Sequence, residues 1–168
     1  IWVHVTGIID YPGVVYKLAE LLEGMNPSSK VLTGQHVVGV EQGNEESTII
    51  TESGRFKGKR LIFCGGLHSD RLAVADGVKP EARIVGFRGD YYDLTKAAEH
   101  KVKNLIYPVP NPEFPFLGVH FTRMIEGGVE CGPNAVFTFK REGYGKTDFN
   151  WQDTREALGY GGTWKLKI

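Results

Sequence analysis

The stretch LIFCGGLHSDRLAVA, residues 61–75, carries the pattern that decides the predicted fold class. Leu61–Cys64 is a continuous apolar run, as expected for a strand that is covered on both faces. Gly65 and Gly66 follow as a turn, and Ser69 is placed to cap a short helix. Strand, glycine turn and helix start form the arrangement in which backbone amides approach an anionic ligand closely. These features favour an α/β fold.

Helix and strand patterns continue on both sides of this stretch. Apolar residues recur at helical spacing after Asp10, which can cap the first amides, so residues 11–24 are predicted to form an amphipathic helix. A second helix is predicted at residues 151–158. The charged run Lys140–Glu142 is expected to be solvated surface, and the alternative is a surface that faces anionic lipid or a partner. Strands are predicted at 30–33, 35–42, 47–52, 55–64, within 83–94, at 117–124 and on both sides of a turn in 127–136.

Composition excludes several classes of function. Hydrophobic residues make up 41% and charged residues 24% of the 168 residues, which is typical of a globular protein. Twenty basic residues balance twenty acidic ones, which argues against a nucleic-acid partner. No apolar run is long enough for a membrane helix. The two cysteines, Cys64 and Cys131, lack partners at metal-ligand spacing, so no metal site is predicted and a reducing compartment such as the cytoplasm is expected.

Several segments in the second half resemble one flavoprotein family. They are Phe87–Tyr92 (FRGDYY), Tyr107–Pro110 (YPVP), Phe114–Thr122 (FPFLGVHFT), Gly132–Val136 (GPNAV) and Phe139–Tyr144 (FKREGY), together with Thr6–Tyr11 (TGIIDY). The chain resembles the L-2-hydroxyglutarate dehydrogenase/oxidase branch of the D-amino-acid-oxidase-like flavoproteins. Two positions depart from the family pattern, since Gly65 replaces an expected alanine and His68 an expected tyrosine.

The resemblance implies an enzyme with FAD that oxidises a small 2-hydroxyacid, most specifically L-2-hydroxyglutarate to 2-oxoglutarate. Electrons would pass to oxygen or to a membrane quinone pool, the latter peripherally at the inner membrane. Residues 1–80 would form part of the FAD-binding domain, and residues 81–168 a mostly antiparallel segment of the substrate domain, an α/β (α+β) architecture. Because Gly-x-Gly-x-x-Gly is missing and the chain opens on Ile1, we expect an internal fragment that alone is inactive, lacks FAD and self-associates.

The resemblance also suggests site residues. His120 is the candidate base, since imidazole titrates near neutral pH; the alternative is a core histidine. Arg88 is the candidate carboxylate ligand, because a guanidinium binds a carboxylate bidentately, and its alternative is an ion pair with Asp90 or Asp93. Tyr107 and Thr122 are also assigned to the substrate, and the alternative for Tyr107, slightly favoured, is that it only packs. Gly65, Gly66 and Asn134, the last in a turn, are assigned to the cofactor. The alternatives are a plain glycine turn at the end of a strand and an asparagine that stabilises its turn.

Two further interpretations stay open. Arg123 is expected to point away from His120 along a regular strand and is assigned no role. The chain is alternatively part of an amino-acid or amine oxidase of the same superfamily, or a non-catalytic binding or interaction module. A Gly-x-Gly-x-x-Gly motif upstream would decide for the enzyme, whereas a gene start without it would favour the module.

Overall fold

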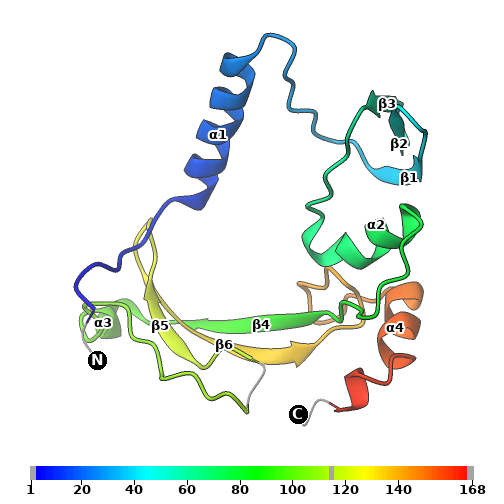
Figure 1. The fold of residues 1–168 in the computed structure, drawn as a ribbon. Helices are drawn as coiled ribbons and strands as arrows, with labels where there is room; N and C mark the ends of the chain where they lie inside the picture. Colours follow the sequence, from blue (N-terminus) through cyan, green and yellow to red (C-terminus); the bar gives the residue numbers. More distant parts are fainter. Residues whose placement is uncertain (1–2, 114–115, 166–168) are drawn as a thin grey trace. The chain divides into compact units, whose positions relative to one another are not determined.

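A computed structural model of the chain describes residues 3–113 and 116–165 (Figure 1). Its contacts fall into two compact units, each built from two stretches of sequence. Unit 1 comprises Ile1–Lys30 and Phe87–Phe137, and unit 2 comprises Val31–Gly86 and Thr138–Ile168. The assignment of residues 1–80 and 81–168 to a flavin and a substrate domain stays a prediction, because contacts within these units do not show what each part binds.

Unit 1 begins with the predicted amphipathic helix. Helix α1 spans Tyr11–Met25, and the carboxylate of Asp10 accepts a hydrogen bond from the amide of Gly13 at 3.0 Å. This cap and the proline in the first turn explain why the helix begins here. Within the described chain, no residue of α1 is buried. The helix prediction is therefore confirmed, and its apolar face is exposed.

The rest of unit 1 is a three-stranded antiparallel sheet. Its strands β4 (Phe87–Asp93), β5 (His120–Arg123) and β6 (Val129–Phe137) lie in the order β4-β6-β5. A short helix, α3 (Lys96–Glu99), follows β4. The turn between β5 and β6 contains Gly127 and Gly128, with φ of 95° and 91°, values that favour glycine. The antiparallel arrangement predicted for this half of the chain is confirmed.

The turn predicted around Asn134 is wrong. Residues 129–137 form one strand, and Asn134 lies opposite Asp90. The register with β4 shifts between Asp90 and Tyr92, beside Pro133, and β5 begins at the residue opposite Gly132. Pro133 has no N–H to donate, but at this position the ladder is already interrupted on both sides. A proline that indicates a turn in the sequence is thus accommodated inside a strand.

Unit 2 contains the predicted meander. Strands β1 (Val37–Glu41), β2 (Ser47–Thr51) and β3 (Arg55–Gly58) pair antiparallel in the order β1-β2-β3. The strand predicted at 30–33 does not form, and the third strand ends at Gly58. The other elements are the 3₁₀ helix η1 (Gly66–His68), helix α2 (Ser69–Ala75), helix α4 (Trp151–Leu158) and the 3₁₀ helix η2 (Thr163–Lys165). Helix α4 has the bounds predicted for it.

The strand predicted at Leu61–Cys64 is also wrong. The segment has no regular structure, and Ile62 is 87% exposed. A continuous apolar run becomes a buried strand only where neighbouring strands bind its backbone groups and cover both faces. None of the described segments forms a ladder with residues 61–64. The glycine turn and the helix of the predicted strand-turn-helix are present, but Ser69 is the first helical residue and His68 is the N-cap.

Unit 2 is held together by an ion-pair cluster that the sequence did not indicate. The guanidinium of Arg141 binds Asp70 and Glu156, and that of Arg71 binds Asp153 and Glu156. The solvated surface predicted for Lys140–Glu142 is therefore wrong at its centre, because Arg141 is only 7% exposed. Helices α2 and α4 both contribute to this cluster, so these pairs connect segments distant in the sequence.

The three carboxyl groups of the cluster have lowered pKa values. Burial by itself would raise the pKa of Asp70, Asp153 and Glu156. Hydrogen bonds and positive charge from the two arginines outweigh that effect, so the pKa of each carboxyl lies below its ordinary value. The folded state thus favours the ionised form of these groups, so the free energy of unfolding depends on pH.

We predict that Arg141→Leu lowers the free energy of unfolding by about 3 kcal/mol at pH 7, because it leaves buried carboxylates without their partner. Since the folded-state pKa values are lowered, the cluster stabilises the fold above the ordinary carboxyl pKa and loses this effect as pH falls below about 5. Urea unfolding at pH 7 and pH 4 measures both effects. Arg83→Leu, at an exposed arginine of the same unit, is the matched control. Equal losses in the two variants would contradict the prediction.

Candidate functional site

His120 occupies a defined position at the start of β5. Its residue is 5% exposed, and Nδ1 lies 2.9 Å from the carbonyl oxygen of Gly118. A carbonyl oxygen can only accept a hydrogen bond, so Nδ1 carries a proton and Nε2 of the neutral ring is an acceptor. The structure shows no hydrogen bond to Nε2 from any described residue. His120 is thus held in the tautomer that can take a proton at Nε2.

Two tyrosines fix the plane of the His120 ring. Tyr107 stacks on it with a centroid separation of 4.5 Å and an interplanar angle of 15°. Tyr91 meets it edge-on at 6.1 Å and 78°. Ile106 and Phe121 exchange two backbone hydrogen bonds of 3.1 and 2.9 Å, which place Tyr107 opposite His120. Tyr107, predicted to contact the substrate or to pack, therefore packs on the candidate base.

Two glycines make this packing possible. Gly132 lies opposite His120 on β6, and a Cβ there would be 2.6 Å from Cδ1 of Tyr91. A Cβ on Gly118 would be 2.6 Å from Cγ of Pro108. Both distances are far shorter than van der Waals contact, so any larger residue would displace the neighbouring ring. The close approach, and not an unusual φ, explains glycine at these positions.

Arg88 forms the ion pair that was the alternative to a substrate contact. Its Nε lies 2.6 Å from Oδ1 of Asp90, and its Nη2 lies 3.3 Å from Oδ2. Thr122 follows His120 by two residues on β5, opposite Glu130. Asn134 is exposed on β6. The structure therefore brings His120, Tyr107, Thr122, Arg88 and Asn134 into one unit, and the roles assigned to them stay predictions.

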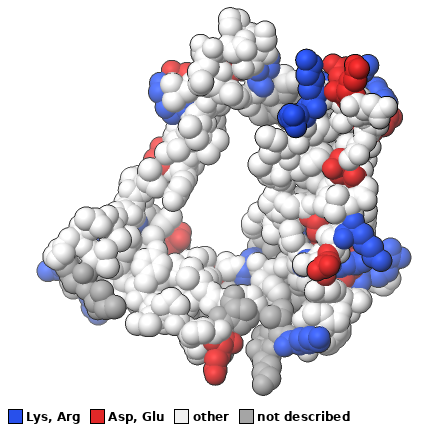
Figure 2. Space-filling view, viewed as in Figure 1, with Lys and Arg blue, Asp and Glu red and all other residues white. Residues whose placement is uncertain are grey.

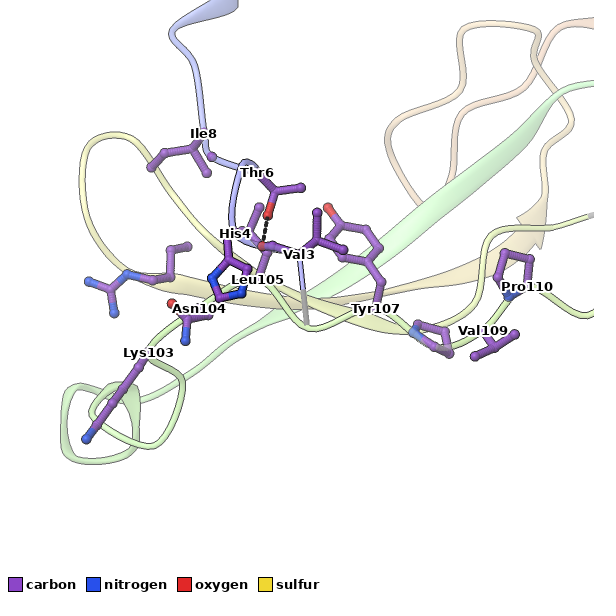
Figure 3. A pocket seen from close by; sticks show the side chains of 13 residues that line it. Val3, His4, Thr6, Ile8, Lys103, Asn104, Leu105, Tyr107, Val109 and Pro110 are labelled. Atoms are coloured by element: carbon purple, nitrogen blue, oxygen red, sulfur yellow. Dashed lines mark hydrogen bonds between the residues drawn. The ribbon is translucent and has the colours of Figure 1, made fainter. Parts of the chain in front are cut away.

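A cavity of about 630 Å³ lies beside Tyr107 within unit 1, and none of His120, Thr122, Arg88 and Asn134 lines it (Figure 3). Two segments, at residues 3–8 and 103–110, line it together with Arg123. Tyr107 is among the lining residues, so the cavity reaches the ring that stacks on His120. Among the described residues that line it there are Lys103, His4 and Arg123, and no aspartate or glutamate.

The sequence did not predict this cationic lining. Arg123 was assigned no role, and Lys103 and Asn104 lie in a loop without a motif. Overall the charges are mixed, and Figure 2 shows blue and red side chains interspersed on the face in view. Only the fold places residues 3–8 beside residues 103–110, so no spacing in the sequence could have identified the cavity.

Comparison with known proteins assigns the family. Residues 1–160 match the family described as FAD dependent oxidoreductase. The chain belongs to this family. The chain is also 48% identical over 167 residues to an L-2-hydroxyglutarate dehydrogenase of Indibacter alkaliphilus, 41% over 163 residues to one of Escherichia coli K12, and 39% over 173 residues to the mitochondrial one of Homo sapiens. These alignments cover 98%, 96% and 96% of this chain, but only 41%, 38% and 37% of the relatives.

The two glycines predicted to contact the cofactor differ in their surroundings. Gly66 has a φ of 51°, and a Cβ there would meet nothing within 4 Å. At Gly65 a Cβ would instead overlap Cδ1 of Leu72, so packing against α2 explains that glycine. Gly66 thus has open space beside it whereas Gly65 is packed, and the cofactor role assigned to Gly65, Gly66 and Asn134 stays a prediction. Within the described ranges, no helix is both long and apolar enough to cross a membrane.

Proposed function

We propose that a full-length enzyme containing this sequence oxidises L-2-hydroxyglutarate to 2-oxoglutarate with FAD as the hydride acceptor. The observation that carries the proposal is the 48% identity, over 98% of this chain, to a protein named L-2-hydroxyglutarate dehydrogenase. The geometry around His120 supports it, because hydroxyacid oxidation needs a base beside the hydroxyl group. The flavin domain at residues 1–80 and the substrate domain at 81–168 are part of this proposal.

In this proposal the C2 hydride and the hydroxyl proton leave the substrate along separate routes. A bound FAD supplies the acceptor for the hydride. Nε2 of His120 takes the hydroxyl proton, while Gly118 holds Nδ1 and Tyr107 holds the ring plane. Charge then develops on the imidazolium, and the Gly118 carbonyl stabilises it because Nδ1 remains a donor.

The remaining predicted residues bind and orient. Thr122 and Tyr107 have hydroxyl groups that can donate to the substrate oxygens. Arg88 contributes a guanidinium, with Asp90 as its ion-pair partner. Gly66, Gly65 and Asn134 are the proposed contacts with the cofactor. Electrons then pass to oxygen in the cytoplasm or to a quinone pool that the enzyme meets peripherally at the inner membrane.

We expect the full-length enzyme to bleach its flavin under anaerobic conditions when L-2-hydroxyglutarate is added, and to respond poorly to the D-enantiomer. Hydride transfer requires one face of C2 to approach the acceptor in the correct geometry, and the D-enantiomer cannot present it with the hydroxyl at His120. Stopped-flow absorbance measures both rates. Bleaching by glycine or D-amino acids, and not by hydroxyacids, would instead establish an amino-acid oxidase.

We expect His120→Asn to slow flavin reduction by roughly 10²–10⁴-fold, the usual contribution of a positioned general base. An asparagine amide can still donate to the Gly118 carbonyl, so the fold and the flavin content should stay near normal. His100→Asn, at an exposed histidine of the same unit, is the matched control. If the His120 variant reduced its flavin at the wild-type rate, His120 would be a structural residue.

We also expect the chain, expressed as these 168 residues alone, to be colourless and to self-associate. Val15, Leu18 and Leu22 of α1 and Ile62 are 48–87% exposed, and exposed apolar patches promote association. Contacts from Gly66, Gly65 and Asn134 alone cannot offset the freedom that FAD loses on binding. Absorbance spectra and light scattering on the purified chain test this. A monomer with near-stoichiometric flavin would contradict it.

A further inference from the structure

The position opposite His120 on the central strand of unit 1 has no side chain. In the order β4-β6-β5, β6 lies between the other two strands, and its Gly132 is the partner of His120 on β5 (Figure 1). A side chain at this position would be the direct cross-strand neighbour of the imidazole, at the distance where such pairs stabilise each other. Because glycine stands there, the imidazole must find that neighbour elsewhere.

Tyr91 of β4 fills this position. A Cβ on Gly132 would lie 2.6 Å from Cδ1 and 2.8 Å from Cγ of Tyr91, so the tyrosine ring occupies the space of the missing side chain. The ring meets that of His120 with a centroid separation of 6.1 Å and an interplanar angle of 78°, the edge-to-face arrangement that aromatic rings prefer. Tyr91 thus reaches across the central strand to the imidazole on the third strand.

The irregular pairing of β4 with β6 explains how Tyr91 reaches so far. Asp90 pairs with Asn134, but Tyr92 pairs with Cys131, so two residues of β6 lie opposite Tyr91 alone. An extra residue of this kind bends the strand and changes the direction of the side chains beside it. The bulge therefore directs the Tyr91 ring over the central strand.

With Tyr91 in place, the imidazole of His120 is contacted on three sides. Tyr107 covers one face, and the carbonyl oxygen of Gly118 accepts from Nδ1. Among the described residues, Oγ1 of Thr138 is the only buried polar side-chain atom without a hydrogen-bond partner. Nε2 of His120 has no such partner either, and it is therefore open to solvent. These contacts leave one ring nitrogen accessible.

We propose that Tyr91 is a positioning residue for His120. Its ring holds the imidazole against the Gly118 carbonyl, and so keeps Nε2 directed at the hydroxyl group of the hydroxyacid. This inference rests on the proposed function. The contact is made by the ring of Tyr91, so its hydroxyl group is not needed. Without the ring, the imidazole can swing over Gly132 and lose its bond at Nδ1.

The test uses the full-length enzyme with its flavin bound, and stopped-flow absorbance at varied concentrations of L-2-hydroxyglutarate. Tyr91→Leu should lower the limiting rate of flavin reduction about 10-fold and change the substrate dissociation constant less than about twofold, because the base remains but is less often oriented. Tyr91→Phe keeps the ring and should recover most of the rate. Tyr92→Leu is the matched control, at a neighbouring tyrosine that is 70% exposed and makes no ring contact with His120.

A second mutation shows whether Tyr91 acts through His120. In a His120→Asn background there is no base to position, so Tyr91→Leu should change the reduction rate less than about twofold. The full loss in that background would overturn the inference, and so would a Tyr91→Phe enzyme as slow as Tyr91→Leu. If Tyr91→Leu does not fold, Tyr91→Met takes its place, since methionine fills irregular space without a ring.

Nitrogen NMR of the enzyme with isotopically labelled histidine gives a readout that does not depend on turnover. The His120 signals are those missing from His120→Asn. In the wild type they should show the proton at Nδ1, whereas Tyr91→Leu should show a mixture of tautomers because the bond to Gly118 is lost part of the time.

The outcomes separate the two proposals. A wild-type enzyme that L-2-hydroxyglutarate does not reduce would overturn the proposed function, and the NMR spectra would then decide whether Tyr91 positions the ring. A wild-type enzyme that is reduced, with the same rate and the same spectrum in Tyr91→Leu, would overturn the inference alone.

Discussion

Two backbone hydrogen bonds between Ile106 and Phe121 determine how the candidate site is assembled. They align the proline-rich segment antiparallel to β5, so that Tyr107 must lie opposite His120. Without this alignment the ring of His120 would lose its stacking partner, and the cavity would lose the wall at residues 103–110. A single isolated bridge is enough because Pro108 and Pro110, which follow it, stiffen the segment.

The sheet of unit 1 supplies the complementary constraint. β6 is the central strand, and its Gly132 lets the ring of Tyr91 cross at the point where β4 carries its register shift. The same irregularity accommodates Pro133. One local disruption of the ladder thus permits both a proline inside a strand and a tyrosine against His120. A bulge beside a candidate site is in keeping with the tendency of bulges to redirect side chains there.

Local patterns predicted the elements whose signal is local. Helices α1 and α4 depend on caps and periodicity that lie within a few residues, and both were found where the sequence placed them. The strand predicted at Leu61–Cys64 is wrong because an apolar run forms a buried strand only where neighbouring strands pair with it. The run itself does not show whether such strands exist. The solvated surface predicted at Arg141 is wrong for a related reason, because its carboxylate partners are 12 to 71 residues away in the sequence. His120 and Tyr107 were assigned by family resemblance, but their stacking could not be deduced from the sequence.

The arginines show why a candidate ligand cannot be chosen by residue type. Arg88, Arg141 and Arg123 can all bind a carboxylate bidentately. Asp90 neutralises the first and Asp70 the second, so their charge is largely used within the protein. The exposed Arg123 donates to the carbonyl oxygen of Val102, which does not neutralise it. A guanidinium that is not neutralised within the protein keeps its charge, whereas the charges of Arg88 and Arg141 serve the fold.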